Sequence, residues 1–267
     1  MLLRTAFLRG FWNVLTACVV MMWPVFVLAQ SPAPTPTVPA ATTEEEEDGG
    51  FSWGVDLDLV SEYNWRGTIL NPDPSIQPGI WASIYGFTAS IWAQIATEAQ
   101  VIDDVEQESF EEIDLTLAYE HSFGNFQLGA GYIRYEYPGF EDVDGTNELY
   151  VSLGYDALIA PSLSVYRDLD VESWYMELGL APEFTVFDKA TFTPSGLVAF
   201  YLFDGEDLQS SLNRFSLGAE LSYPLGSVFS VSGQVHWEIP FGDEEDFEEE
   251  GFFENRVWGG IGLHLEM

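Results

Sequence analysis

The stretch Val55-Asp-Leu-Asp-Leu-Val-Ser-Glu-Tyr-Asn-Trp65 decides the fold expected for this chain. Apolar residues occupy one parity of the stretch, and Asp, Glu and Asn occupy most of the other. An alternation of period two is typical of a β-strand with two unlike faces. Similar segments recur as far as Met267. We therefore expect an all-β protein.

From Phe51 onward we count about 12 such segments, each long enough to cross a membrane at a tilt, which takes roughly 9 to 11 residues. Three segments alternate less cleanly, and either bulges or a mixed interior would explain them: 76–86, 126–137 and 190–203. A soluble β-sandwich also alternates, but here the polar parity mixes Gly, Ser and Thr with carboxylates, which suits a wet interior. The sequence predicts a transmembrane antiparallel up-and-down β-barrel over 51–267.

The connections between the segments support the barrel, because short and long ones should alternate. The long connections, expected on the outside of the cell, are 66–75, 98–111, 137–147, 168–173, 204–213 and 240–254. The short ones, expected in the periplasm, lie near 85–86, 122–125, 157–162, 182–189 and 223–227. The turn at 182–189 and the compact loop at 168–173 fit this alternation least well.

Aromatic residues at two heights predict the girdles of a membrane barrel, where amphipathic rings meet the two interfaces. We place one set at the outer strand ends: Tyr63, Trp65, Trp174 and Trp237. The other set falls at the inner strand ends: Trp53, Tyr119, Tyr155 and Tyr223.

The first 29 residues predict an export signal, with Arg4 and Arg9 before an apolar run and Val27-Leu28-Ala29 as the cleavage site. An uncleaved single-span anchor is the alternative. Residues 30–50 combine Pro, Ala and Thr with an acidic run, which indicates a disordered periplasmic linker. The only cysteine, Cys18, lies inside the signal, so the mature chain has no disulfide.

The chain carries 8 Lys and Arg against 44 Asp and Glu, and 15% of its residues are aromatic. A disordered acidic chain would lack the aromatic residues, so this chain is expected to fold. Charge of this sign excludes nucleic acid as a partner.

The segment Val60-Ser-Glu-Tyr-Asn-Trp-Arg-Gly-Thr68, followed by Gln77-Pro-Gly79 and Trp92, resembles the opening of the TorF-like family of outer-membrane porin-like proteins. In that family a Ser-acidic-Tyr-x-aromatic-Arg-Gly motif closes the first strand. The resemblance implies an outer-membrane barrel with a pore role, and it supplies no established catalytic residues or substrate. One departure is the last residue, Met267, where such barrels usually end in Phe or Trp for their assembly machinery.

Carboxylates crowd the long connections and would concentrate cations at the mouth of a barrel. A plain solvated surface is the alternative. No cofactor is expected, although loosely bound Ca²⁺ or Mg²⁺ would suit oxygen ligands and could bridge the loops to lipopolysaccharide phosphates. The weak metal candidates are Asp142, Asp144, Asp243 and Glu244.

Three arginines point inward by parity on strands that come together when the barrel closes: Arg66, Arg214 and Arg256. Three carboxylates point inward from the opposite wall: Glu112, Asp114 and Glu148. These six residues predict a constriction whose transverse field favours small polar solutes. Alternatively, each arginine pairs with a neighbouring carboxylate such as Glu62 and tightens the wall.

An enzyme is not expected, because His121, His236 and His264 lie at different heights. Ser232 and His236 share a face, but four residues along a strand is about 13 Å. We expect a porin-like channel for ions or small polar solutes with a cation preference, in the outer membrane and with a periplasmic N-terminus. The alternative is a non-conducting barrel that binds divalent cations or lipopolysaccharide. Membrane lipid and the barrel-assembly machinery are the expected partners.

Overall fold

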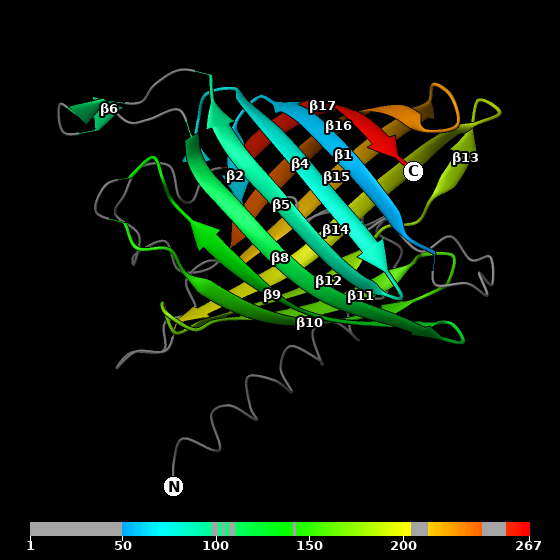
Figure 1. The fold of residues 1–267 in the computed structure, drawn as a ribbon, viewed down its shortest axis with the longest axis horizontal. Coiled ribbons are helices and arrows are strands. Elements are labelled where there is room, and N and C mark those ends of the chain that lie inside the picture. Colours follow the sequence, from blue (N-terminus) through cyan, green and yellow to red (C-terminus); the bar gives the residue numbers. More distant parts are fainter. Residues whose placement is uncertain are drawn as a thin grey trace, which may run out of the picture.

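Most of the strands belong to one sheet that closes on itself (Figure 1). The computed structural model describes residues 50–97, 101–102, 105–106, 110–140, 143–203, 213–241 and 255–267. Neighbouring strands pair antiparallel around the ring, and the ring closes where β1 pairs with β17. The predicted fold class, an antiparallel β-barrel of 12 strands, is confirmed.

The strands of the wall follow one another along the chain. They are β1 (Ser52–Val60), β4 (Ser75–Ile84), β5 (Phe87–Ala96), β8 (Phe110–Phe123), β9 (Phe126–Glu136), β10 (Asn147–Tyr155), β11 (Pro161–Asp168), β12 (Ser173–Leu180), β14 (Ala190–Phe203), β15 (Asn213–Pro224), β16 (Phe229–Phe241) and β17 (Arg256–Glu266). Short extra strands are β2 (Tyr63–Trp65), β3 (Thr68–Asn71), β6 (Val101–Ile102), β7 (Val105–Glu106) and β13 (Phe184–Val186).

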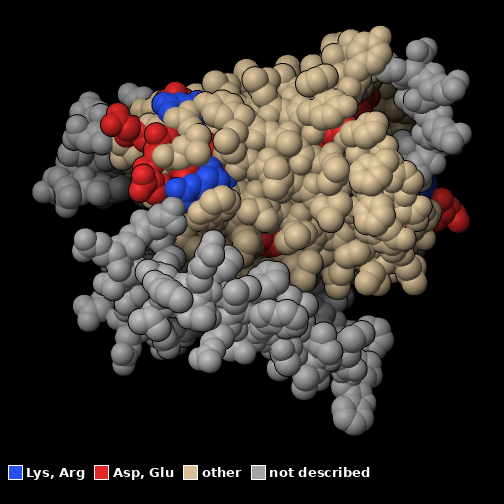
Figure 2. Space-filling view, turned by 90° about the horizontal axis from the view of Figure 1, so that it is seen from below, with Lys and Arg blue, Asp and Glu red and all other residues tan. Residues whose placement is uncertain are grey.

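The two faces of the wall are the reverse of those in a soluble protein. Leu117 on β8 is 62% exposed on the outer face, whereas Glu148 and Arg214 are 2% and 4% exposed inside. On the face seen in Figure 2, the part of the wall that is not grey carries few charged side chains, and these gather mainly at one end. Such a surface is stable only against an apolar solvent, so the apolar parity faces lipid, as predicted.

Closure satisfies the backbone as well as the side chains. Leu57 and Leu263 lie in register at the seam between β1 and β17. Beyond them, Trp53 and Met267 exchange two backbone hydrogen bonds, with N to O distances of 2.9 and 3.0 Å. A closed ladder leaves no open sheet edge in the hydrocarbon region, where an unpaired peptide group costs several kcal/mol.

The connections alternate in length as predicted, apart from residues 169–172 at the long-loop end, which are as short as the turns. At the short-turn end, the strands are joined through residues 85–86, 124–125, 156–160 and 225–228, and through β13. At the long-loop end, the connections are 61–74, 97–109, 137–146, 169–172, 204–212 and 242–255.

The connection expected at 182–189 is not a simple turn, because it contains the short strand β13. Leu180 pairs with Gly196 and Phe184 pairs with Phe192, so the register continues unchanged from β12 into β13. The interruption contains Pro182, and Pro194 stands on the facing strand β14. Neither proline has the N–H that a ladder hydrogen bond needs. The actual turn is reduced to residues 187–189.

The first strand ends earlier than the sequence predicted. β1 stops at Val60, and Tyr63 and Trp65 belong to the short hairpin β2–β3 instead of the outer aromatic girdle. Tyr63 is 3% exposed because the chain turns into the barrel after Ser61 and Glu62. The exposed rings of Trp174 and Trp237, and of Tyr119, Tyr155 and Tyr223, agree with the predicted levels.

The three less regular segments are ordinary strands with a mixed interior. Trp81 on β4, Ile133 on β9 and Leu197 on β14 are buried inside, which breaks the apolar-out pattern. The wall bulge lies elsewhere, between Gln94 and Ile95 of β5.

No helix among the described residues is long and apolar enough to cross a membrane. The predicted signal peptide at 1–29, and the predicted linker at 30–50 apart from Gly50, lie outside the described residues.

The lipid-facing assignment predicts the effect of a charge on the wall. Leu117→Lys, at the middle of β8, should destabilise the folded barrel in a bilayer by about 2–4 kcal/mol, as expected for Lys near the midplane. The matched control is Leu158→Lys in the turn at 156–160, which should cost about 0–1 kcal/mol. Reversible folding into lipid vesicles measures both, and equal costs would contradict the assignment.

Candidate functional site

A hairpin from the long-loop end folds into the barrel, where most of its side chains are buried. This lumen hairpin consists of β2, β3 and the turn between them. Arg66 and Gly67 in the turn have φ values of 51° and 86°, in the left-handed region that favours glycine. The Gly67 N–H donates to Asn64 Oδ1 at 3.0 Å. The hairpin thereby places Arg66 inside the barrel, where this residue is only 7% exposed.

Two carboxylates of the wall hold the sides of the lumen hairpin. The Tyr63 hydroxyl donates to Glu112 Oε2 at 2.8 Å. The Asn71 amide donates to Glu111 at 2.8 and 2.9 Å. Glu111 and Glu112 are consecutive residues of β8, and both are buried. The hairpin is therefore fixed to the wall on each of its two strands.

The tip of the hairpin makes a bidentate ion pair across the lumen. Arg66 Nη1 and Nη2 each lie 2.7 Å from an oxygen of Glu148 on β10. The Tyr135 hydroxyl donates to the same carboxylate at 2.9 Å. A planar guanidinium matches a carboxylate in this way, so the pair fixes geometry as well as charge.

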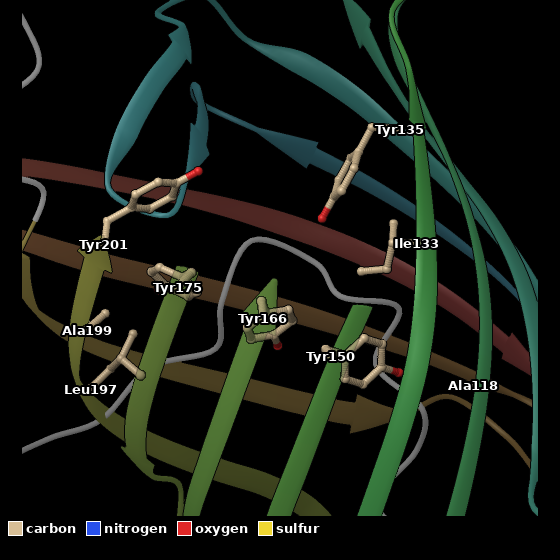
Figure 3. Close-up of a cluster of buried hydrophobic side chains, with 9 residues drawn as sticks. All are labelled: Ala118, Ile133, Tyr135, Tyr150, Tyr166, Tyr175, Leu197, Ala199 and Tyr201. Carbon is tan, nitrogen blue, oxygen red and sulfur yellow. The ribbon is translucent and has the colours of Figure 1, made fainter. Parts of the chain in front are cut away.

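Four tyrosines on neighbouring strands form a ladder inside the barrel (Figure 3). Tyr150, Tyr166, Tyr175 and Tyr201 lie in register on four consecutive wall strands. Successive ring centroids are 5.5, 5.7 and 5.9 Å apart. The Arg66 guanidinium lies 4.5 Å from the Tyr166 centroid and 4.3 Å from that of Tyr175. Cation–π attraction therefore adds to the ion pair.

A second buried arginine extends the cluster. Arg214 lies 3.1 Å from Glu238 and donates to the Tyr175 hydroxyl at 2.8 Å. Ser216 and Trp258 also donate to Glu238. A side chain at Gly67 would meet the Arg214 Cδ, so only glycine allows this approach. The tip of the hairpin thus joins both arginine sites.

The structure brings most of the predicted constriction residues together. Arg66 contacts Glu148 directly, Arg214 joins them through Tyr175, and Glu112 binds the hairpin at Tyr63, close to Asp114. The arginines and carboxylates are therefore paired in one cluster, in contrast to the expected separation on opposite walls. The physical reason is the lumen hairpin, which moves Arg66 off the wall.

Arg256 lies in register with Glu238, the partner of Arg214, and also acts on Glu62, which follows β1. Burial raises the pKa of the Glu62 carboxyl, and the positive charge of Arg256 acts in the opposite direction. This pair corresponds to the alternative in which an arginine tightens the wall through Glu62.

Sequence reasoning missed the tyrosine ladder and the hairpin. Tyr150, Tyr166 and Tyr175 stand among polar residues on the inward parity, where a wet lumen would favour small side chains. Bulky rings on the inward parity of successive strands were the available signal.

Of the weak metal candidates, Asp142, Asp243 and Glu244 lie outside the described residues, and Asp144 lies within them. In the described ranges, no group of three or more His, Cys, Asp or Glu side chains is placed to hold a metal ion.

One family model matches most of the chain. The model of the family described as "Bacterial protein of unknown function (Gcw_chp)" matches residues 44–230. The chain belongs to the Gcw_chp family. No curated protein sequence matches this Gcw_chp member.

Two solved structures similar to this Gcw_chp member are an outer-membrane channel and a porin. An outer-membrane channel from Pseudomonas putida F1 has a TM-score of 0.54 at 10% identity, and the match covers 86% of this chain and 100% of that one. The NanC porin has a TM-score of 0.53 at 10% identity, with 79% and 98% covered. At this level of identity the likeness concerns the fold alone.

The buried ion pair predicts a strong coupling. Arg66→Met leaves Glu148 buried without its partner and should lower the free energy of unfolding by about 3–5 kcal/mol. Glu148→Leu should have a similar effect, and the double variant should lose much less than the sum. Arg134→Met is the control, because the pair of Arg134 with Glu136 is exposed and should matter little. Additive losses in the cycle would contradict the coupling.

Proposed function

We propose that this protein is an outer-membrane channel with a narrow lumen that passes small cations or small polar solutes. The observation that carries the proposal is a closed barrel whose interior holds ionisable side chains while its exterior is apolar. A barrel of eight strands is filled by side chains and one of 16 to 18 holds a wide channel, so 12 strands suit a narrow one. The similar outer-membrane folds agree with this function.

The charge of the lumen supports cation preference. Carboxylates outnumber the arginines on the inward face of the barrel. The inward arginines are Arg66, Arg214 and Arg256, whereas the inward carboxylates include Asp56, Asp58, Glu112, Asp114, Glu120, Glu148, Glu177, Glu220 and Glu238. A passage lined by one sign of charge raises the local concentration of the opposite ion. The acidic long connections would add to the effect at the mouth.

The lumen hairpin supplies the constriction in this proposal. The motif Ser61-Glu-Tyr-Asn-Trp-Arg-Gly67, on which the resemblance to the TorF-like porins depends, is the part of the chain that turns inward. Its Tyr63 and Arg66 are bound to Glu112 and Glu148. The constriction residues of the proposal are Arg66, Arg214, Arg256, Glu112, Asp114 and Glu148.

We also propose an orientation of the barrel in the outer membrane. The short-turn end, where β1 begins, would face the periplasm, and the long-loop end would face lipopolysaccharide outside. Membrane lipid and the barrel-assembly machinery remain the proposed partners, with Ca²⁺ or Mg²⁺ as loosely bound ions at the loops.

Channel recordings in planar bilayers test the function. The purified protein should give discrete current steps, and a salt gradient should give a reversal potential of the sign for cation flow. Replacing residues 62–70 by a Gly-Ser linker should raise the conductance, because it removes the lumen hairpin. An anion-selective reversal potential would contradict the cation preference.

The role of the arginines is tested separately. The triple variant Arg66→Ala, Arg214→Ala and Arg256→Ala should increase both conductance and cation selectivity, because it removes bulk and positive charge from the narrowest part. The matched control is Arg134→Ala, which removes an arginine from outside the cluster. Unaltered conductance and selectivity in the triple variant would refute the constriction.

A non-conducting barrel is the second candidate, and the dense packing around Arg66 and Tyr175 favours it. In that case the acidic loops would bind divalent cations and lipopolysaccharide. Absence of current from the wild type and also from the hairpin-replacement variant would select this function over the channel.

A further inference from the structure

Far from the lumen hairpin, toward the short-turn end, three side chains form a continuous hydrogen-bonded chain. Ser232 Oγ lies 2.9 Å from His264 Nε2, and His264 Nδ1 lies 2.8 Å from Asp56 Oδ1. One ring nitrogen of His264 therefore contacts a hydroxyl, and the other contacts a carboxylate. This order of serine, histidine and aspartate is the arrangement that activates a serine nucleophile in hydrolases of unrelated folds.

The registers of three neighbouring strands create the constellation. Asp56 on β1 lies directly opposite His264 on β17, across the seam that closes the barrel. Ser232 on β16 lies opposite Gly262, two residues from His264, and such diagonal neighbours are within reach of a long side chain. Closure of the barrel is therefore needed to assemble the three residues.

Gly262 gives the three side chains their room. It lies in register with both Asp58 and Ser232. A side chain at this position would collide with Asp58 Oδ1, His264 Nε2 and Ser232 Oγ together. Because Gly262 has no side chain, the wall leaves room for the contact between the Ser232 hydroxyl and the His264 imidazole.

The site is open to the lumen, in contrast to the ion pair at the hairpin. The side chains of His264 and Asp56 are 28% and 27% exposed, against 6% and 2% for Arg66 and Glu148. A pair that only stabilised the wall would not need this access. Open access from the lumen is what a reactive group requires.

We infer that Ser232, His264 and Asp56 form an esterase site for small esters that enter from the short-turn end. Ser232 Oγ attacks the ester carbonyl carbon while His264 takes its proton. The bond to the alcohol oxygen then breaks, and His264 returns the proton to the leaving alcohol. Water, deprotonated by His264, next attacks the acyl-serine, which releases the carboxylic acid and restores the Ser232 hydroxyl. Asp56 is the positioning residue that orients the imidazole.

The surroundings define the class of substrate. Asp58 on β1 and Glu220 on β15 place negative charge near His264, so neutral or cationic esters are favoured over anionic ones. The backbone of β16 is engaged in ladders on both sides, so a side chain must donate to the developing oxyanion. Gln234, two residues from Ser232 on the same face, carries the nearest amide along this strand. Its Oε1 lies 2.7 Å from His236 Nε2, so the amide turns from His236 toward Ser232 when it donates to the oxyanion.

Covalent labelling tests the nucleophile. Phenylmethanesulfonyl fluoride should form a bond from its sulfur to Ser232 Oγ with loss of fluoride, and peptide mass spectrometry should find the adduct on Ser232. His264→Ala should slow the labelling about 100-fold, since general-base assistance contributes at least that much. Ser222→Ala is the matched control, because Ser222 faces Ser232 from β15 and should not affect the rate. Heat-modifiable migration on gels shows that each variant is folded.

Turnover tests the complete site. Nitrophenyl acetate, a small neutral ester, should be hydrolysed by the intact protein in detergent, and Ser232→Ala should abolish this activity. Asp56→Asn should slow it, whereas Asp56→Glu should restore much of it, which a purely structural role would not predict. The absence of an adduct on Ser232 in the folded wild type, or equal labelling in His264→Ala, would overturn the inference. Channel conductance is measured independently, so failure of either function leaves the other open to its own test.

Discussion

The closed ladder of backbone hydrogen bonds is the constraint on which the rest of this structure depends. In hydrocarbon every peptide group must find a partner within the protein, and only a sheet without edges achieves this with strands. Pairing of β1 with β17, continued by Trp53 and Met267, provides that closure. Once the wall is closed, its outer face must be apolar, and polar side chains are confined to the lumen. The same closure brings Asp56 next to His264.

Charge inside the lumen is tolerated because it is paired. Burying an isolated guanidinium or carboxylate is costly, and an ion pair offsets this cost only with good geometry and further hydrogen bonds. The Arg66–Glu148 pair has both, through two contacts of 2.7 Å and the Tyr135 hydroxyl. The tyrosine ladder supplies polarisable faces for the remaining surface of the guanidinium. The pair therefore adds to the contacts of Tyr63 and Asn71 that hold the hairpin in the lumen.

The lumen is divided into two levels with different properties. Toward the long-loop end, the hairpin, the arginines and the tyrosines form a packed layer with little exposure. Toward the short-turn end, Asp56, Ser232 and His264 remain accessible. A channel function is controlled by the first level, and the inferred chemistry belongs to the second. Because the levels share no hydrogen bond among the described residues, mutations can separate them.

The sequence by itself determined the fold, the identity of the two faces and the alternation of the connections. These follow from a side-chain period of two, which Leu57 and Asp58 express locally and which needs no knowledge of contacts. Inward-facing Glu112, Glu148 and Arg214 were assigned on the same basis. The tertiary structure alone decided which of these residues meet. Period two leaves the relative shift of neighbouring strands undefined, so the diagonal from Ser232 to His264 could not be derived from spacing. Likewise, the alternation of apolar and polar residues continues to Trp65 and gives no sign that the chain bends inward after Val60. The partners that stabilise the bend, which are Glu112 on β8 for Tyr63 and Glu148 on β10 for Arg66, lie far away in sequence.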